Sequence, residues 1–74
     1  MDNIIFSDFG CTILRRDGRY FIRYDSGGIA SWLLENEISA ANAEKAKKSE
    51  KDAYEVILSA ESEREPRRVA DANE

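Results

Sequence analysis

The sequence predicts an α+β fold, in which a small antiparallel sheet of two to three strands is followed by one or two helices. Two observations support this prediction. Apolar residues alternate with polar ones around Asp17-Gly18, a dipeptide typical of tight β-hairpins. Farther along, Ser39 and Ser49 each precede a run of good helix formers. A chain of 74 residues is long enough for one small domain.

The first three expected elements are strands, at residues 3–9, 11–15 and 20–24. The last two flank Asp17-Gly18, and these residue types accept the positive φ that a type I′ turn requires. A two-residue turn makes Arg16 face Arg19 across the hairpin and ends with Cys11 facing Tyr24.

Register also assigns the two faces of this hairpin, because successive side chains point to opposite sides of a strand. The more apolar face, expected to face the core, holds Cys11, Ile13, Tyr20, Ile22 and Tyr24, with Arg15 at its end. The other face holds Thr12, Leu14, Arg16, Arg19, Phe21 and Arg23.

After the hairpin the pattern is less decisive. Apolar residues at i, i+3 and i+4 within 29–34 favour a short helical turn, with a strand as the alternative. The following Glu35-Asn36-Glu37 is expected to be a solvated connector. Trp32 is either part of the core or, if exposed, an anchor for a partner.

Two helices are expected next. Ser39 is the predicted N-cap of residues 40–47, and Ser49 is the predicted N-cap of a helix over about 50–63. One continuous helix is the alternative, because serine is tolerated inside helices. The second segment carries an apolar stripe of Ala53, Val56, Ile57 and Ala60, with Tyr54 and Leu58 beside it.

The end of the chain lacks an apolar pattern. Pro66 ends any preceding helix, and Val69 is the only large apolar residue in 64–74. This composition predicts a disordered tail over 64–74, which follows a single domain over 1–63.

Composition excludes several kinds of function. Histidine is absent, and the single Cys11 allows neither an internal disulfide nor a thiolate zinc site. We therefore expect no enzyme activity, no catalytic residue, no metal and no cofactor. The lone thiol and the lack of a signal-like N-terminus or long apolar run favour a cytoplasmic protein without a membrane anchor.

The hairpin arginines Arg16, Arg19 and Arg23 form the most distinctive charged cluster. Three interpretations are open: they solubilise a sheet face, they contact acids of a partner protein or of this chain's own acidic helices, or they bind nucleic acid. With 15 acids against 11 bases, the net charge of −4 makes nucleic acid the less favoured partner.

The helical half supplies a different candidate contact surface, because most of the acids lie there. Glu50, Asp52 and Glu55 belong to the first turns of the second expected helix. Such a surface fits a basic, nucleic-acid-binding protein, although it is also the ordinary surface of a solvated helix.

These observations favour a small, acidic, non-catalytic protein-binding module. Inhibitors from mobile elements, including anti-CRISPR, immunity and antitoxin proteins, combine this size and acidity with a lack of catalytic groups. We expect such a module to occlude the surface of a partner protein, through Arg16, Arg19, Arg23, Trp32, Glu50, Asp52 and Glu55. The alternatives are a regulator that binds nucleic acid through the arginine hairpin, and a subunit of a homo-oligomer.

Overall fold

The computed structural model of the chain describes residues 3–26 and 32–71. Its elements, in chain order, are β1 (Asn3–Asp8), β2 (Cys11–Arg16), β3 (Arg19–Asp25), β4 (Trp32–Ile38), α1 (Ala40–Ala46), α2 (Glu50–Glu63) and β5 (Arg67–Asp71). The strands form one sheet of order β1-β2-β3-β4-β5, and every neighbouring pair is antiparallel. The α+β prediction is confirmed, but the sheet has five strands instead of two or three.

The β2–β3 hairpin has the predicted register, from Arg16 opposite Arg19 to Cys11 opposite Tyr24. Asp17 and Gly18 both have positive φ, of 53° and 77°, as a type I′ turn requires. The predicted core face is also confirmed, because Ile13 and Ile22 are fully buried in the core cluster and pair with each other.

Strand β4 corrects the prediction for residues 29–34. Residues 32–34 are extended, Leu33 and Leu34 pair with β3, and Glu35-Asn36-Glu37 continues the same strand instead of forming a solvated connector. Six consecutive pairs with β3 satisfy the backbone of this strand, which outweighs a helical pattern only one turn long. The rest of the expected helical turn, 29–31, lies outside the described residues.

Strand β5 corrects the prediction of a disordered tail for residues 67–71. This segment pairs with the outer edge of β4, from Glu35 opposite Arg67 to Trp32 opposite Asp71. Backbone pairing at a sheet edge needs no apolar side chains, so composition did not reveal this strand. The last residues of the expected tail, 72–74, lie outside the described part of the chain.

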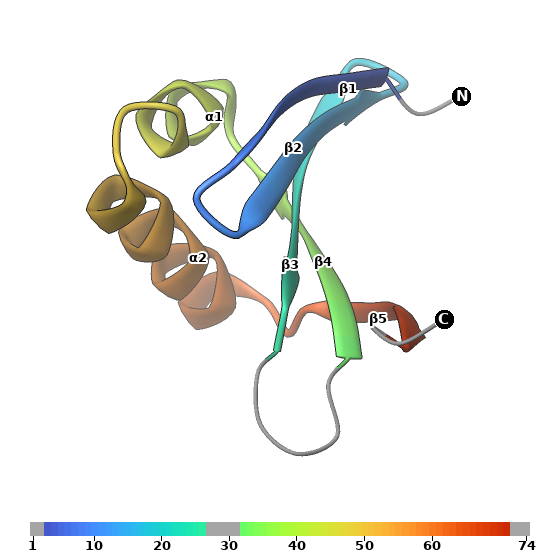
Figure 1. Cartoon of the computed structure of the whole chain (residues 1–74). Helices are drawn as coiled ribbons and strands as arrows, with labels where there is room; N and C mark the ends of the chain where they lie inside the picture. The colour runs from blue at the N-terminus through green and yellow to red at the C-terminus, as the bar shows by residue number, and fades with distance from the viewer. Residues whose placement is uncertain (1–2, 27–31, 72–74) are drawn as a thin grey trace.

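The two predicted serine caps are confirmed, and with them the presence of two helices instead of one. Ser39 Oγ accepts a hydrogen bond from the backbone N–H of Asn42, and Ser49 Oγ accepts one from Asp52, each at 3.1 Å. Both helices lie against one side of the sheet (Figure 1). No helix in the described ranges has the length and apolar character needed to cross a membrane.

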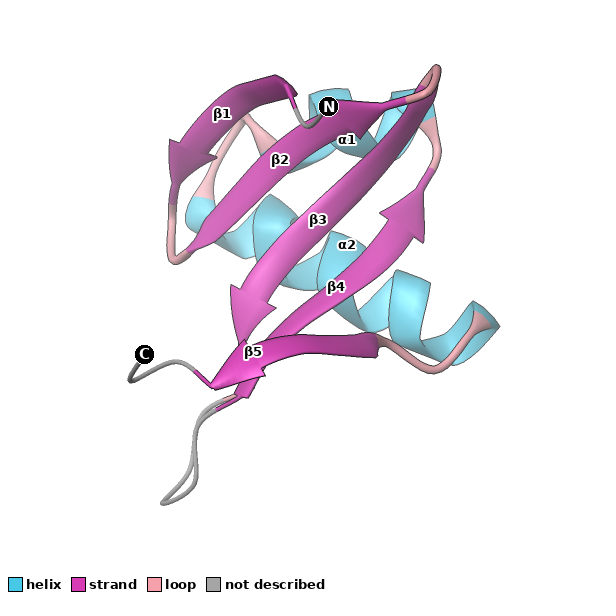
Figure 2. Ribbon diagram, turned by 90° about the vertical axis from the view of Figure 1, so that its right-hand side faces the viewer, coloured by secondary structure: helices cyan, strands magenta, loops and turns pink. Residues whose placement is uncertain are grey.

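The core lies between this side of the sheet and the helix pair, which stands behind the sheet in Figure 2. The helices contribute mainly small side chains: Ala43, Ala46, Ala53, Val56 and Ala60. Small residues let the helix backbones approach the sheet closely. The opposite side of the sheet carries no helix in the described ranges, and we call it the open face.

Candidate functional site

A buried carboxylate organises the open face. The Glu35 side chain is 3% exposed and lies between two arginines of the hairpin. Arg16 donates from Nη1 to Oε1 at 3.0 Å and from Nη2 to Oε2 at 3.2 Å. Arg23 donates from Nη2 to Oε2 at 2.7 Å. Two of the three predicted hairpin arginines therefore donate hydrogen bonds to a carboxylate of their own chain.

These contacts govern the ionisation of Glu35. Burial by itself raises the pKa of the carboxyl group, but hydrogen bonds and positive charge from Arg16 and Arg23 outweigh this effect. The pKa of Glu35 is consequently held below its ordinary value, and the group is a carboxylate at neutral pH.

The same arginines cover apolar side chains on the open face. The Arg16 guanidinium lies 4.8 Å from the centroid of the Phe21 ring. Leu14, the cross-strand partner of Phe21, is fully buried although it faces away from the helices. Arginine combines an apolar stem with a charged end, so it shields such residues from water while remaining charged.

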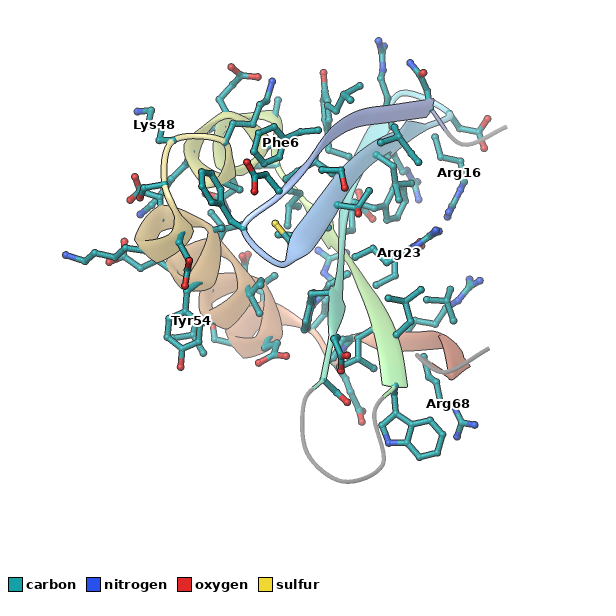
Figure 3. All side chains as sticks on the ribbon, in the orientation of Figure 1. Phe6, Arg16, Arg23, Lys48, Tyr54 and Arg68 are labelled. Atoms are coloured by element: carbon teal, nitrogen blue, oxygen red, sulfur yellow. The ribbon has the colours of Figure 1, made fainter. Side chains whose placement is uncertain are left out.

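Beyond Glu35, the open face is hollowed by a cavity of about 600 Å³, which we call the arginine hollow. Arg16, Arg19, Phe21, Glu37, Arg64 and Arg67 are among its lining residues. Arg64 Nη1 donates to Glu37 Oε1 at 3.3 Å, and Arg19 Nη1 lies 3.9 Å from the same oxygen. Figure 3 shows Arg16 and Arg23 on the side of the sheet away from α2.

Arg64 and Arg67 were missed by the sequence analysis, which assigned both to a disordered tail. Arg64 is the C-cap residue of α2, and Arg67 is the first residue of β5. The end of α2, where Asn36 Nδ2 donates to the Arg64 carbonyl at 3.1 Å, brings Arg64 to the hollow, and the pairing of β5 with β4 brings Arg67. The sequence carried a weak signal in Arg67-Arg68, two adjacent cations after a proline.

A second hollow, of about 410 Å³, lies beside α2 and is called the α2 hollow here. Phe9, Glu50, Lys51, Tyr54 and Ile57 line it. Tyr54 is 61% exposed and Leu58, one turn farther along α2, is 46% exposed.

Phe9 reaches the α2 hollow from the tight turn between β1 and β2. Its φ of 54° is unusual for a residue with a side chain. The Asp8 carboxylate accepts a hydrogen bond from the Phe9 N–H at 2.7 Å, and the Phe6 ring packs 5.7 Å from the Phe9 ring between centroids. These contacts hold the Phe9 ring toward the helix layer.

The structure separates the three predicted acids of α2. Glu50 lines the α2 hollow, on the same side of the helix as Tyr54 and Ile57. Asp52 and Glu55 lie on the other flank, where Glu55 pairs with Lys45 of α1 at 3.0 Å. Glu61, which the prediction left out, belongs to the side of Glu50 by its spacing and accepts a hydrogen bond from Tyr24 Oη at 2.6 Å.

Trp32 joins neither hollow. It is half-buried at the start of β4 and outside the core cluster, so the core position, one of its two predicted alternatives, is not observed. The Arg68 guanidinium lies 3.5 Å from the centroid of its ring, a cation–π contact that connects β4 with β5.

Cys11, the one thiol, is buried on the core face. Burial first, and the nearby Asp8 charge second, raise its pKa, which keeps the sulfur protonated and unreactive. Within the described ranges, no group of three or more histidine, cysteine or acidic side chains is arranged to hold a metal ion.

Comparison of the chain with protein-family models, with curated proteins and with solved structures gives no match.

Proposed function

We propose that this protein is a small, non-catalytic module that binds a partner protein through the α2 hollow and thereby occludes part of the partner's surface. Small inhibitors of the immunity, antitoxin or anti-CRISPR type act in this way. The observation that carries the proposal is the exposed apolar surface of Tyr54 and Leu58 beside a hollow lined by Phe9 and Ile57.

Exposed aromatic and aliphatic side chains next to a hollow favour protein contact. Tyrosine supplies a large apolar ring with a polar end, and such residues dominate the binding energy of interfaces. Tyr54 holds this position on a rigid helix whose opposite face, Ala53, Val56 and Ala60, is buried against the sheet. Binding therefore requires little ordering of the module itself.

Charge indicates which partner chemistry fits. Tyr54 and Ile57 lie on one side of α2, and Glu50 and Glu61 lie at opposite ends of that side. The whole chain carries a net charge of −4. Among the residues that the structure describes, Lys51 is the one cation that lines the α2 hollow. The complementary partner segment presents an apolar side chain to Phe9 and Tyr54, with lysine or arginine placed to meet the two acids.

The experiment compares three immobilised baits in a nuclease-treated bacterial lysate: the wild type, Tyr54→Ala and Ile4→Ala. Ile4 is the matched control, because it is an exposed apolar residue, 63% accessible, on β1. The proposal expects a stoichiometric protein that is retained by the wild type and by Ile4→Ala but lost with Tyr54→Ala. Its retention by Tyr54→Ala contradicts the proposed surface.

Charge reversal provides an independent measurement on the captured complex. Glu50→Lys is expected to weaken binding at least about tenfold, because it places a cation against a basic segment. Glu55→Lys is the matched control on the other flank of α2, and its expected change is less than about threefold. A self-association that depends on Tyr54 assigns the hollow to a second copy of this chain and overturns the proposal of a different partner.

A further inference from the structure

The arginine hollow collects cations from parts of the chain that are distant in sequence. Arg16 ends β2, Arg19 begins β3, Arg64 follows α2 and Arg67 begins β5. The β2–β3 register places Arg16 opposite Arg19, the C-terminal end of α2 places Arg64, and the edge pairing of β5 places Arg67. The core cluster lies on the other side of the sheet and contains none of them.

The acids of the hollow neutralise these cations unevenly. At the floor of the hollow, both carboxylate oxygens of Glu35 accept hydrogen bonds from Arg16 and Arg23. Glu37 offers a single oxygen, Oε1, to both Arg64 and Arg19, at 3.3 Å and 3.9 Å. These are long contacts for charge-assisted hydrogen bonds, which are typically about 2.7–2.9 Å.

Arg67 is the least neutralised cation of the hollow. Arg67 is exposed, and it lies opposite Glu35 in the β4–β5 register. Even so, its guanidinium forms no ion pair with a carboxylate in the described part of the chain. Asp17 and Glu65 also line the hollow, and both of these acids are exposed. Three accessible guanidiniums, those of Arg19, Arg64 and Arg67, therefore surround a space in which one carboxylate oxygen serves two of them.

We propose that the arginine hollow binds a phosphate group, supplied either by a nucleic-acid backbone or by a free phosphate compound such as a nucleotide. A phosphate presents several oxygens and up to two charges, so it engages more guanidiniums at once than a carboxylate does. Arg19, Arg64 and Arg67 contact the phosphate, while Arg16 and Arg23 hold the floor through Glu35.

Glu37 acts as the internal competitor of this ligand. When phosphate enters, its oxygens replace Glu37 Oε1 on Arg64 and Arg19, and the carboxylate turns toward solvent. Glu37 is 32% exposed, so it can leave without disturbing a buried contact. This arrangement makes an unusual prediction: Glu37→Gln strengthens binding, because it removes the competing charge and keeps the shape of the side chain.

The test uses a fluorescein-labelled twelve-nucleotide single-stranded oligothymidylate, titrated with the full chain at low salt and followed by fluorescence anisotropy. Arg67→Ala is expected to weaken binding at least about fivefold and to lower the salt dependence by about one counterion. Glu37→Gln is expected to tighten binding by about threefold or more. Arg15→Ala is the matched control, because Arg15 is an exposed arginine whose register partner is Tyr20, on the opposite side of the sheet.

Competition with unlabelled pyrophosphate distinguishes the two phosphate sources. Displacement at a pyrophosphate concentration comparable to that of the oligonucleotide phosphates supports binding of a free phosphate compound. Resistance to pyrophosphate, with the same variant effects, supports the nucleic-acid backbone. Displacement by polyglutamate as effective as that by the oligonucleotide overturns the proposal in favour of an acidic protein segment. Equal losses in Arg15→Ala and Arg67→Ala, or an absence of binding at 0.1 mM protein (about the weak limit of non-specific binding), also overturn it.

Discussion

At the scale of single residues, Glu35 shows how one carboxylate can decide the role of its neighbours. The hairpin arginines are predicted to bind a partner, but Arg16 and Arg23 donate hydrogen bonds to this carboxylate. Their side chains remain about one quarter exposed, at 27% and 25%. Arg19, which is 67% exposed, remains accessible to a ligand.

Replacing this carboxylate is expected to destabilise the fold. Glu35→Gln leaves two partly buried guanidiniums facing a neutral amide, which costs about 2–3 kcal/mol in the free energy of unfolding. Urea denaturation followed by circular dichroism measures the loss. The matched control is Glu37→Gln, at a more exposed position, with an expected cost below about 1 kcal/mol. Equal costs for the two variants contradict a special role for Glu35.

The lowered pKa of Glu35 predicts a pH dependence with a definite sign. A carboxyl group whose pKa is lower in the folded state than in the unfolded state stabilises the fold above its unfolded pKa. That contribution disappears as the pH falls from the ordinary value of 4.5 through the lower folded value. The stability difference between wild type and Glu35→Gln is therefore expected to be constant near pH 7 and to shrink below pH 4.5. Unfolding curves of both proteins, recorded from neutral pH down to strong acid, measure this stability difference. A difference that persists in strong acid would show that the charge of Glu35 is not the source of the stabilisation.

At the scale of elements, β5 is the decisive addition to the sheet. It satisfies the outer edge of β4, which carries Glu35 and Glu37, and it places Arg67 at the arginine hollow. A short edge strand rich in charge also discourages pairing with other chains. One element thus completes both the sheet and the proposed phosphate site.

Truncation after Glu65 is expected to expose the edge of β4. Loss of the β4–β5 ladder costs about 2 kcal/mol of stability, from a few backbone hydrogen bonds of modest net value. Hydrogen exchange is expected to accelerate at β4 amides that face β5, while those of the β2–β3 hairpin keep their protection. Deletion of 72–74 alone is the control and leaves exchange in β4 unchanged. Unchanged β4 protection in the longer truncation contradicts a stable β5.

At the scale of the whole molecule, the two hollows lie on opposite sides of the sheet. The α2 hollow belongs to the helix layer and the arginine hollow to the open face, and none of the described residues lines both hollows. Figure 3 shows Tyr54 and Arg16 on opposite sides of the β-strands. The two proposed ligands, a partner protein at the α2 hollow and a phosphate group at the arginine hollow, are therefore expected to bind at the same time.

Independent sites predict additive effects. Tyr54→Ala is expected to leave oligonucleotide affinity within about twofold of the wild type, and Arg67→Ala to do the same for the protein partner. In the double variant, each loss is expected to equal that of the single variant. Anisotropy and calorimetric titrations of the four proteins measure these affinities. If either substitution strongly changes the affinity for the other ligand, the two ligands share a surface, and the prediction of independent sites is wrong.

The local parts of this fold can be predicted from the amino-acid sequence. The β2–β3 register follows from Asp17-Gly18, and the two helices follow from Ser39 and Ser49, because turn and cap chemistry acts over a few residues. The extended state of β4, the existence of β5 and the burial of Glu35 could not be predicted in this way. Each of these depends on backbone or charge partners distant along the chain, and a local pattern does not record such partners. For the same reason the local pattern indicates Arg16 as a candidate site residue, whereas the positions of Arg64 and Arg67 follow from the packing of α2 and the pairing of β5.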